Sequence, residues 1–411
     1  MKTQVLVIGG GAAGLICAGF AAQRGLDTLI LERNERPARK VMITGKGRCN
    51  VTNASDLQEL IAAVPKNGRF LYSAFSAFSS DDTIELLRSM GVETKTERGK
   101  RVFPVSDRAV DVVDALVRFA KTNGAAFYQG RAVKLNIHEQ KLISVTCENG
   151  DEIFCDAAVI CTGGLSYPKT GSTGDGYDLA KQAGHSIIPP VPSLVPLCIH
   201  EGAATRMQGL SLRNTALKVR DNDTGKTIYS DFGELLFTHF GVSGPIILSA
   251  SAHMHDMRPG KYSVVLDLKP ALTDEMLDKR LLRDFQENAG KDFINAIHKL
   301  LPGKMLPVLV DISGIPAHSK VGQITKEQRS SFCRLLKNLT FIVDGFRPIE
   351  EAIVTAGGVA VNEIQPGTMR SQKCENLYFA GEVMDVDAYT GGYNLQIAFS
   401  TGCIAGKNVL K

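Results

Sequence analysis

The chain has 411 residues, of which 44% are hydrophobic and 22% are charged, so it is long enough for two or three globular domains. Its net charge of +4 permits an anionic partner but does not demand one. Nine cysteines without a C-x-x-C pair argue against a disulfide framework and against a zinc site, and they favour a cytoplasmic location. No segment has the roughly 18–20 apolar residues of a membrane span. We therefore expect no metal and no membrane contact.

The chain begins with the pattern of a βαβ unit. Gln4–Ile8 is a short apolar run that predicts a buried strand, Ala12–Arg24 has helical composition, and Thr28–Glu32 predicts a second buried strand. A mixed α/β stretch follows to about residue 184, with amphipathic helices expected near 81–90 and 110–123 and strands around 133–153.

The middle of the chain differs in composition, with a proline-rich segment followed by a stretch of predicted strands. Four prolines between 189 and 196 suit a domain crossing better than the interior of an element. Strands are expected up to about 270, and helices over 273 to about 300 and near 326–336. From about 340 the chain again has an α/β pattern.

The first glycine motif predicts a dinucleotide site. Gly9, Gly11 and Gly14 follow the first strand and open the first helix, whose N-terminus offers free N–H groups to a pyrophosphate. Glu32 ends the second strand, where an acid accepts hydrogen bonds from ribose hydroxyls. The alternative is a purely structural glycine turn.

A second segment favours FAD over NAD. A strand ends at Gly381-Glu382, and Gly391-Gly392 open a further helix. An acid there suits ribityl hydroxyls, and a second helix N-terminus suits the negative charge that develops on a reduced flavin. Between the two motifs, residues 40–53 (KVMITGKGRCNVTN) carry glycines and cations that suit a phosphate and a flavin ring; the alternative is a charged surface loop.

These segments resemble the BaiN/RdsA-like (YhiN-type) family of FAD-dependent oxidoreductases. The similar stretches are residues 7–15, 40–53, 101–116, 160–180, 233–248, 353–364 and 377–402. The resemblance implies an α/β fold with a Rossmann-type FAD-binding domain of the glutathione-reductase type, interrupted by a β-barrel-like domain and a small helical subdomain. The implied boundaries are 1–190 with 340–411 for the FAD domain, 191–270 with about 330–355 for the barrel, and 271–330 for the helices.

The motifs and the resemblance together imply a set of cofactor contacts. They are Gly9, Gly11, Ala12, Ala13, Gly14, Glu32, Arg33, Lys40, Thr44, Gly45, Gly47, Arg48, Cys49, Asn50, Val133, Thr162, Gly163, Gly164, Gly381, Glu382, Asp385, Gly392, Tyr393, Asn394, Leu395 and Gln396. Gly174-Asp175-Gly176 is also expected near the adenosine half. FAD is the expected bound cofactor.

No second glycine motif of a nicotinamide domain is present, so we expect NAD(P)H to act as a transient electron donor. Three candidates for catalysis are Cys49, Arg101 and Tyr393. We expect Cys49 to have a lowered pKa because Arg48 precedes it. The H-x-H pair His253 and His255 lacks a third metal ligand.

The resemblance implies several substrates. The leading one is a uridine of 23S ribosomal RNA, reduced to dihydrouridine; the alternatives are a bile-acid-like ene-reductase, an amino-ketone oxidase and a non-catalytic flavin-bearing redox module. Two sets of cations are candidates for RNA phosphate contacts. Aromatic residues are candidates for stacking on an extruded base. These cations are Lys95, Arg98, Lys100, Arg101, Arg108, Lys279, Arg280, Arg283 and Lys291, and the aromatic residues are Phe103, Tyr167 and Tyr393. The oligomeric state stays open.

Overall fold

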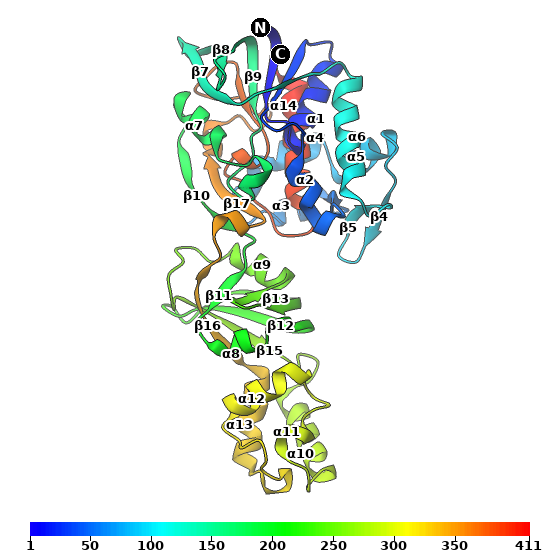
Figure 1. Cartoon of the computed structure of the whole chain (residues 1–411), viewed down its shortest axis with the longest axis vertical. Coiled ribbons are helices and arrows are strands. Elements are labelled where there is room, and N and C mark those ends of the chain that lie inside the picture. The colour runs from blue at the N-terminus through cyan, green and yellow to red at the C-terminus, as the bar shows by residue number, and fades with distance from the viewer. The chain divides into compact units, whose positions relative to one another are not determined.

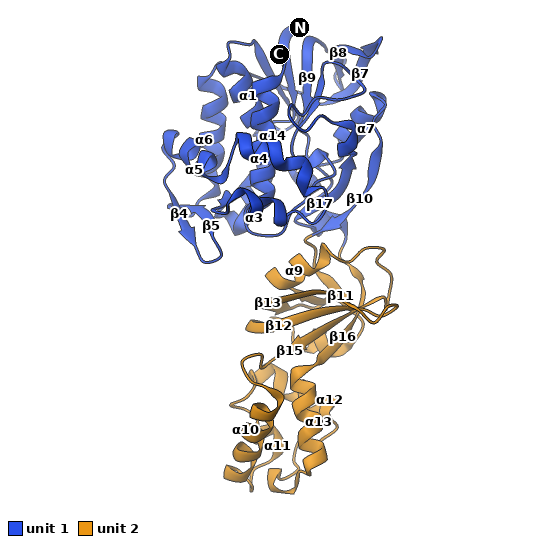
Figure 2. Ribbon diagram, turned by 180° about the vertical axis from the view of Figure 1, so that it is seen from behind, with its two compact units in different colours: residues 1–193, 348–411 blue, residues 194–347 orange.

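A computed structural model describes residues 1–411 and divides them into two compact units. Unit 1 comprises residues 1–193 and 348–411, and unit 2 comprises residues 194–347 (Figure 2). No helix of the structure is both long enough and apolar enough to cross a membrane.

Unit 1 is built on a seven-stranded sheet with the order β6-β2-β1-β9-β8-β7, in which β18 also pairs with β9. The pairs of β1 with β2 and β9, of β2 with β6 and of β9 with β18 are parallel. The parallel strands β1 and β2 read as apolar runs because both faces of such a sheet are covered. The bounds are β1 (Lys2–Ile8), β2 (Thr28–Glu32), β6 (Ala126–Gln129), β7 (Ala132–His138), β8 (Lys141–Cys147), β9 (Glu152–Ile160) and β18 (Leu377–Phe379).

Helices cover this sheet, and a small sheet of three strands flanks it. The helices are α1 (Ala12–Gln23), α2 (Arg39–Ile43), α3 (Leu57–Ala62), α4 (Tyr72–Ala77), α5 (Ser80–Ser89), α6 (Ala109–Thr122), α7 (Asp175–Gln182) and α14 (Tyr393–Asn408). The small sheet has the order β3-β5-β4, with β3 (Thr52–Asn53), β4 (Thr94–Glu97) and β5 (Arg101–Pro104).

The first and last helices of the chain, α1 and α14, lie side by side (Figure 1). Glycines allow this contact: a Cβ atom at Gly402 would collide with the carbonyl oxygen of Ala13, and one at Gly406 would collide with that of Cys17. The ends of the chain thus share one core, and both helices begin at the same side of unit 1.

The proline-rich segment is a strand, which corrects the expected irregular crossing. β10 (Ile187–Ser193) pairs with β17 (Val354–Val359) in a two-stranded sheet, and the register shifts between Ile188 and Val191. A two-stranded ribbon with a bulge tolerates prolines because each strand is an edge with N–H groups that need no ladder partner. The boundary between the two units lies at the end of β10, after Ser193.

Unit 2 contains a closed six-stranded barrel and a group of helices. The barrel order is β11-β14-β13-β12-β15-β16, with β11 (Leu197–Ile199), β12 (Ser211–Asp221), β13 (Thr227–Phe237), β14 (Gly241–Ser243), β15 (Tyr262–Asp267) and β16 (Leu339–Phe346). The helices are α8 (Gly202–Arg206), α9 (Pro245–Ser251), α10 (Asp274–Glu287), α11 (Phe293–Ala296), α12 (Leu306–Ser313) and α13 (Lys326–Lys337). The continuous helix expected to about residue 300 is wrong, because α10 ends before the Asn288-Ala289-Gly290 turn.

The glycine contact between α1 and α14 makes a direct prediction. Gly402→Ala should lower the free energy of unfolding by about 2–3 kcal/mol, because the added methyl group overpacks a helix crossing that cannot open locally. Thermal unfolding of the purified protein measures the effect. Gly367→Ala is the control, since no atom lies within 4 Å of a Cβ placed there and its φ is not positive. Equal melting temperatures for both variants would contradict the packing argument.

Candidate functional site

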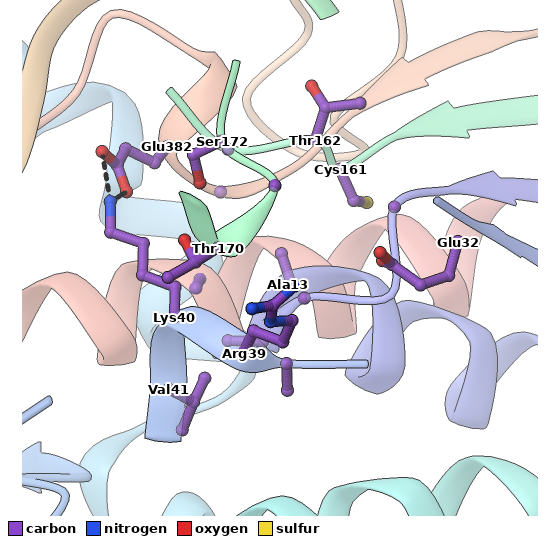
Figure 3. A pocket seen from close by; sticks show the side chains of 18 of the residues that line it. Ala13, Glu32, Arg39, Lys40, Val41, Cys161, Thr162, Thr170, Ser172 and Glu382 are labelled. Carbon is purple, nitrogen blue, oxygen red and sulfur yellow. Dashed lines mark hydrogen bonds and ion pairs between the residues drawn. The ribbon is translucent and has the colours of Figure 1, made fainter. Parts of the chain in front are cut away.

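A cavity of about 1300 Å³, including its open mouth, lies in unit 1 where β1, β2 and β9 end (Figure 3). The carboxyl ends of parallel strands are the usual ligand side of such sheets. The sequence-predicted residues that line it are Gly9, Gly11, Ala12, Ala13, Glu32, Arg33, Lys40, Thr44, Thr162, Gly163, Gly381, Glu382, Asn394 and Leu395. Segments far apart in the chain therefore meet around one space.

The glycines of the turn before α1 have two different roles, close packing and access of the backbone to the cavity. Substituents at Gly9 and Gly14 would strike neighbouring backbone, at Cys161 and Gly9 respectively, so these glycines allow tight packing. A Cβ at Gly11, in contrast, would have its nearest neighbour at 4.0 Å. The backbone of Gly11 therefore borders open cavity space, and the first-turn amides of α1 have no intrahelical partners. This end of the cavity suits a phosphate group.

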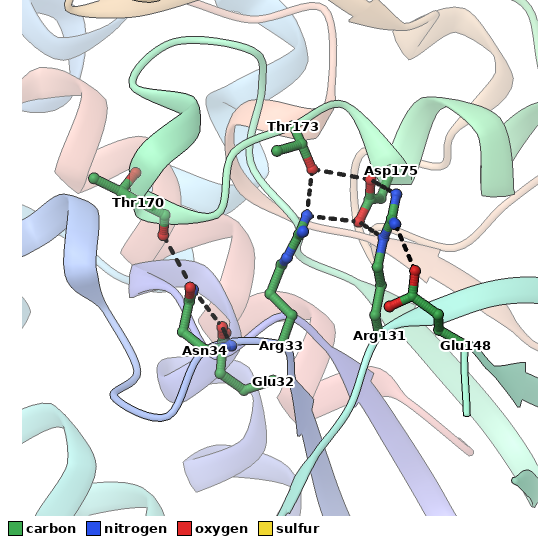
Figure 4. A network of polar contacts seen from close by, with 8 residues as sticks. All are labelled: Glu32, Arg33, Asn34, Arg131, Glu148, Thr170, Thr173 and Asp175. Carbon is green, nitrogen blue, oxygen red and sulfur yellow. Dashed lines mark hydrogen bonds and ion pairs between the residues drawn. The ribbon is translucent and has the colours of Figure 1, made fainter.

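Glu32 is held rigidly at the end of β2, with a side chain 9% exposed. Its two carboxylate oxygens accept hydrogen bonds from the amides of Gly10 and Asn34, each at 2.7 Å. The Asn34 side chain also donates to the Thr170 carbonyl, which ties this strand end to the loop before α7 (Figure 4). Oε1 also accepts from the Asn34 side chain at 2.7 Å, whereas Oε2 has one further lone pair, so a ribose hydroxyl finds a fixed acceptor there.

Two arginines beside Glu32 are neutralised by acids. Arg131 forms a two-pronged pair with Asp175, with both N···O distances at 2.9 Å, and Arg33 reaches the same carboxylate at 3.1 Å (Figure 4). Glu148 accepts a third hydrogen bond from Arg131. Burial opposes ionisation of Asp175, but the Arg131 guanidinium and the Thr173 hydroxyl lower its pKa. With their charges satisfied, the arginines favour an unphosphorylated ribose over the 2′-phosphate of NADP.

Lys40 and Glu382 meet at another part of the cavity wall. The Lys40 ammonium pairs with Glu382 (Figure 3), with 2.7 Å to one carboxylate oxygen. It also donates to the Ser166 hydroxyl at 2.6 Å. The Thr355 amide donates to the other Glu382 oxygen at 2.9 Å. The acid expected to receive ribityl hydroxyls thus faces the cavity already fixed in one orientation, and a cation lies beside it.

The start of α14 supplies the second helix N-terminus. Gly392 takes a φ of 99° against the Thr52 backbone, a position that other residues rarely adopt. Asn394 fixes the approaching loop by bonding both the amide and the carbonyl of Ala388. Leu395 lines the cavity beside Asn394, and the first-turn amides point away from the body of the helix.

Other predicted contacts of this helix and its approach lie inside the protein. Gln396 is fully buried and hydrogen-bonds Thr52 and Thr83 through its oxygen and the Phe78 carbonyl through its nitrogen. The Asp385 carboxylate, 4% exposed, pairs with Lys66 at 2.7 Å. Both side chains position the helix start from behind and do not line the cavity.

The loop 44–50 contacts the cavity through Thr44 alone. Arg48 turns away to Glu97 and Asp107, at 2.5 and 2.6 Å, and covers the Phe103 ring. Gly45 and Gly47 adopt positive φ values, and the buried Oδ1 of Asn50 has no hydrogen-bond partner. Because Asn50 lies outside the cavity lining, this orphaned acceptor does not bear on the fit of a cofactor there.

The expected lowering of the Cys49 pKa is wrong. Cys49 is fully buried, and this burial raises the pKa of its thiol to about 12. The neighbouring Arg48 does not compensate, because its charge is engaged by two carboxylates. The Cys49 thiol therefore stays protonated, but it is a weaker acid than expected and lies outside the cavity lining.

The remaining predicted residues lie outside the cavity lining. Val133 is 40% exposed on β7, whereas the adjacent Gly130, Arg131 and Ala132 line the cavity. Gly164 packs against Thr355. The catalytic candidate Arg101 is exposed on β5. The candidate Tyr393 is half-buried and is the first residue of α14. Arg131 was missed from the sequence, because its only sequence signal is its position after the end of β6. Asn34 was missed because that residue contributes by hydrogen-bonding Glu32.

The cavity fits FAD on three observations made on the chain itself. Gly11 leaves open backbone at a helix start, Glu32 presents a fixed acid, and the cavity-lining Thr162 has a buried hydroxyl oxygen without a hydrogen-bond partner. The start of α14 adds a second positive helix end. Residues that would hold the cofactor are therefore contributed by both ends of the chain.

Known proteins agree with this assignment. The model of the HI0933-like protein Rossmann domain matches residues 3–408. The ribosomal RNA dihydrouridine synthase of Escherichia coli is 31% identical over 409 residues, covering 100% of this chain and 98% of the relative. The 3-dehydro-bile acid delta(4,6)-reductase of Clostridium scindens is 30% identical over 415 residues, covering 98% of each.

A solved structure shares the fold. The 3-ketosteroid-delta4-(5alpha)-dehydrogenase of Rhodococcus jostii RHA1 superimposes with a TM-score of 0.54 at 13% identity, covering 100% of this chain and 97% of that one. The expected fold class, family resemblance and cofactor are confirmed. The chain belongs to the HI0933-like family and is an FAD-dependent oxidoreductase.

Proposed function

We propose that this protein reduces the C5=C6 bond of a uridine in 23S ribosomal RNA to give dihydrouridine, with NAD(P)H as a transient donor. The observation that carries the proposal is the similarity to a ribosomal RNA dihydrouridine synthase over 100% of this chain and 98% of that relative. Such a substrate places the protein in the cytoplasm, where ribosomal RNA is found in bacteria.

Reduction of the uridine requires the site to orient the base and to provide a proton. Bound FAD, once reduced by NAD(P)H, would supply a hydride to C6 of the base, because the substrate double bond is conjugated to a carbonyl, and C5 would take a proton. The chain must orient the base and provide that proton. The amides at its two helix starts face the cavity with a partial positive charge, which supports anionic charge that develops during reduction.

Of the three catalytic candidates, we favour Tyr393 as the proton donor. Its half-buried ring follows Gly392 at the start of α14, directly before the cavity-lining Asn394. Arg101 is more distant from the cavity lining: its guanidinium donates to the Arg98 carbonyl on the exposed β4–β5 hairpin. A role for Arg101 in contacting the substrate backbone suits this position better than proton transfer.

The cations expected to face RNA near this hairpin are largely neutralised. Lys95 pairs with Asp107 at 2.7 Å, Lys100 pairs with Glu59 at 2.6 Å, and Arg108 lies 3.9 Å from Asp111. Arg98 and Arg101 remain as exposed cations in the hairpin. Phe103 cannot stack on an extruded base as expected, because it is only 4% exposed and Arg48 covers its ring.

A second candidate is a small-molecule ene-reductase. The full-length similarity to the bile-acid reductase favours it, since that relative also reduces a carbon–carbon double bond. The two functions share the cofactor and the hydride step and differ in the substrate.

Loss of the gene should remove one dihydrouridine from 23S ribosomal RNA. Nucleoside mass spectrometry and reverse-transcription mapping of ribosomal RNA from cells with and without the gene measure this, and re-expression should restore the nucleoside. An unchanged dihydrouridine content would reject the RNA substrate and turn attention to steroid-like enones, tested with purified protein and NAD(P)H.

Arg131→Met should weaken FAD retention about tenfold, equivalent to about 1.4 kcal/mol, because Asp175 loses the partner that ties α7 to the cavity wall. The fluorescence of released FAD gives the dissociation rate. Arg36→Met is the matched control, since Arg36 pairs with Asp114 away from the cavity. Similar release rates from both variants would speak against the Arg131–Asp175 pair as a cofactor clamp.

Tyr393→Phe should slow dihydrouridine formation by roughly 10²–10⁴-fold, the usual range for loss of a general acid. FAD content and the rate of flavin reduction by NAD(P)H should stay unchanged, because neither needs the hydroxyl group. Cys49→Ala should keep most of the activity, since its buried thiol is neutral. A fully active Tyr393→Phe protein would remove Tyr393 as the donor.

A further inference from the structure

The excess positive charge of the chain is confined to one part of it. Unit 1 contains 27 basic and 27 acidic residues, whereas unit 2 contains 20 basic and 16 acidic residues. Within unit 2 the excess falls in residues 268–338, the helical part, with 12 basic and 8 acidic residues. A concentrated positive surface is the electrostatic mark of a polyanion partner.

Ion pairs within the helical part engage several arginines and leave four lysines without an acidic partner. Asp278 is paired with Arg329 at 2.8 Å, and Asp284 is shared by Arg280 and Arg283. Arg329 thus links α13 to α10, whereas Arg280 and Arg283 share an acid of their own helix. By contrast, Lys279, Lys291, Lys299 and Lys326 are exposed and make no ion pair.

One of these unpaired lysines, Lys291, lines a surface hollow in unit 2. We name it the basic hollow; it is lined by Lys291, Asp292, Asn295, His298 and Lys320. It lies where the residues around α11 meet the segment 318–320, joined by the bridge between Asp292 and Lys320. Lysine and amide groups are donors that match phosphate oxygens.

The single acid in the hollow orders its cations. Asp292 lies 2.7 Å from the Lys320 ammonium and 3.1 Å from His318, and these two partners lower its pKa. His298 donates through Nδ1 to the Asn295 carbonyl, which turns its other ring nitrogen away from that bond. Lys291 has no carboxylate within ion-pair distance, so its charge is available to a ligand.

We propose that the basic hollow binds backbone phosphates of the ribosomal RNA substrate, so that the helical part of unit 2 serves as an RNA-anchoring element. The proposal rests on the proposed RNA substrate. Because the flavin unit has no net charge, affinity for RNA comes chiefly from unit 2, while unit 1 supplies the chemistry.

The test uses the full FAD-loaded protein and protein-free 23S ribosomal RNA from cells that lack the gene. The double variant Lys291→Gln/Lys320→Gln removes two charges and keeps side-chain length and hydrogen bonding. Lys226→Gln is the control, since Lys226 is an exposed lysine of the β12–β13 turn in the same unit. Binding is measured at several salt concentrations, alongside FAD content and flavin reduction by NAD(P)H without RNA.

The double variant should bind RNA roughly tenfold more weakly, and its dependence of log K on log salt should become shallower by about 0.7–0.9, the value for one lost phosphate contact, because Lys320 is already paired with Asp292. FAD content and flavin reduction should match the wild type, and Lys226→Gln should bind RNA normally. If the wild type forms dihydrouridine but the double variant binds RNA as tightly as it does, the basic hollow is not an anchor. If the wild type neither binds nor modifies RNA, the proposed function fails and the hollow loses its partner with it.

Discussion

The contact between α1 and α14 is the constraint on which the site depends. Gly402 and Gly406 bring the last helix against the backbone of the first, and this closeness makes two helix starts border one cavity. Each helix end has amides without intrahelical partners and a partial positive charge. An elongated cofactor with a pyrophosphate and a reducible ring matches this pair of ends, and neither end alone would bind it.

Ion pairs then shape the cavity without filling it with charge. Arg33 and Arg131 are satisfied by Asp175, and Lys40 is satisfied by Glu382, so each wall is rigid and nearly neutral. Such fixed groups are already oriented before a ligand arrives, which reduces the cost of ordering them on binding. The two units also differ in charge: unit 1 has no net charge, and the excess cations lie in the helical part of unit 2.

Local patterns were enough to predict the first βαβ unit, its glycine turn and Glu32, because each depends on neighbours within about 30 residues. The strand-rich middle and the return to an α/β pattern near 340 followed from sequence patterns, whereas the barrel and the link of both ends to one flavin fold followed from the family resemblance. What depends on tertiary burial was missed: the Cys49 pKa is set by its complete burial, and the Arg131–Asp175 pair joins segments that no motif connects. Gln396 belongs to a motif of the cofactor site yet is a buried structural residue. The proline strand β10 escaped prediction because its bulge and two-stranded pairing are invisible locally.

The most direct test of this account is the cofactor content of the purified protein. Native mass spectrometry and the absorption spectrum of the released cofactor should show one FAD per chain, bound without a covalent link. A Gly402→Ala protein that remains folded should hold it less tightly, because the second helix start is displaced. A colourless protein that takes up no flavin on incubation with FAD would contradict the convergence of α1 and α14 on a flavin site.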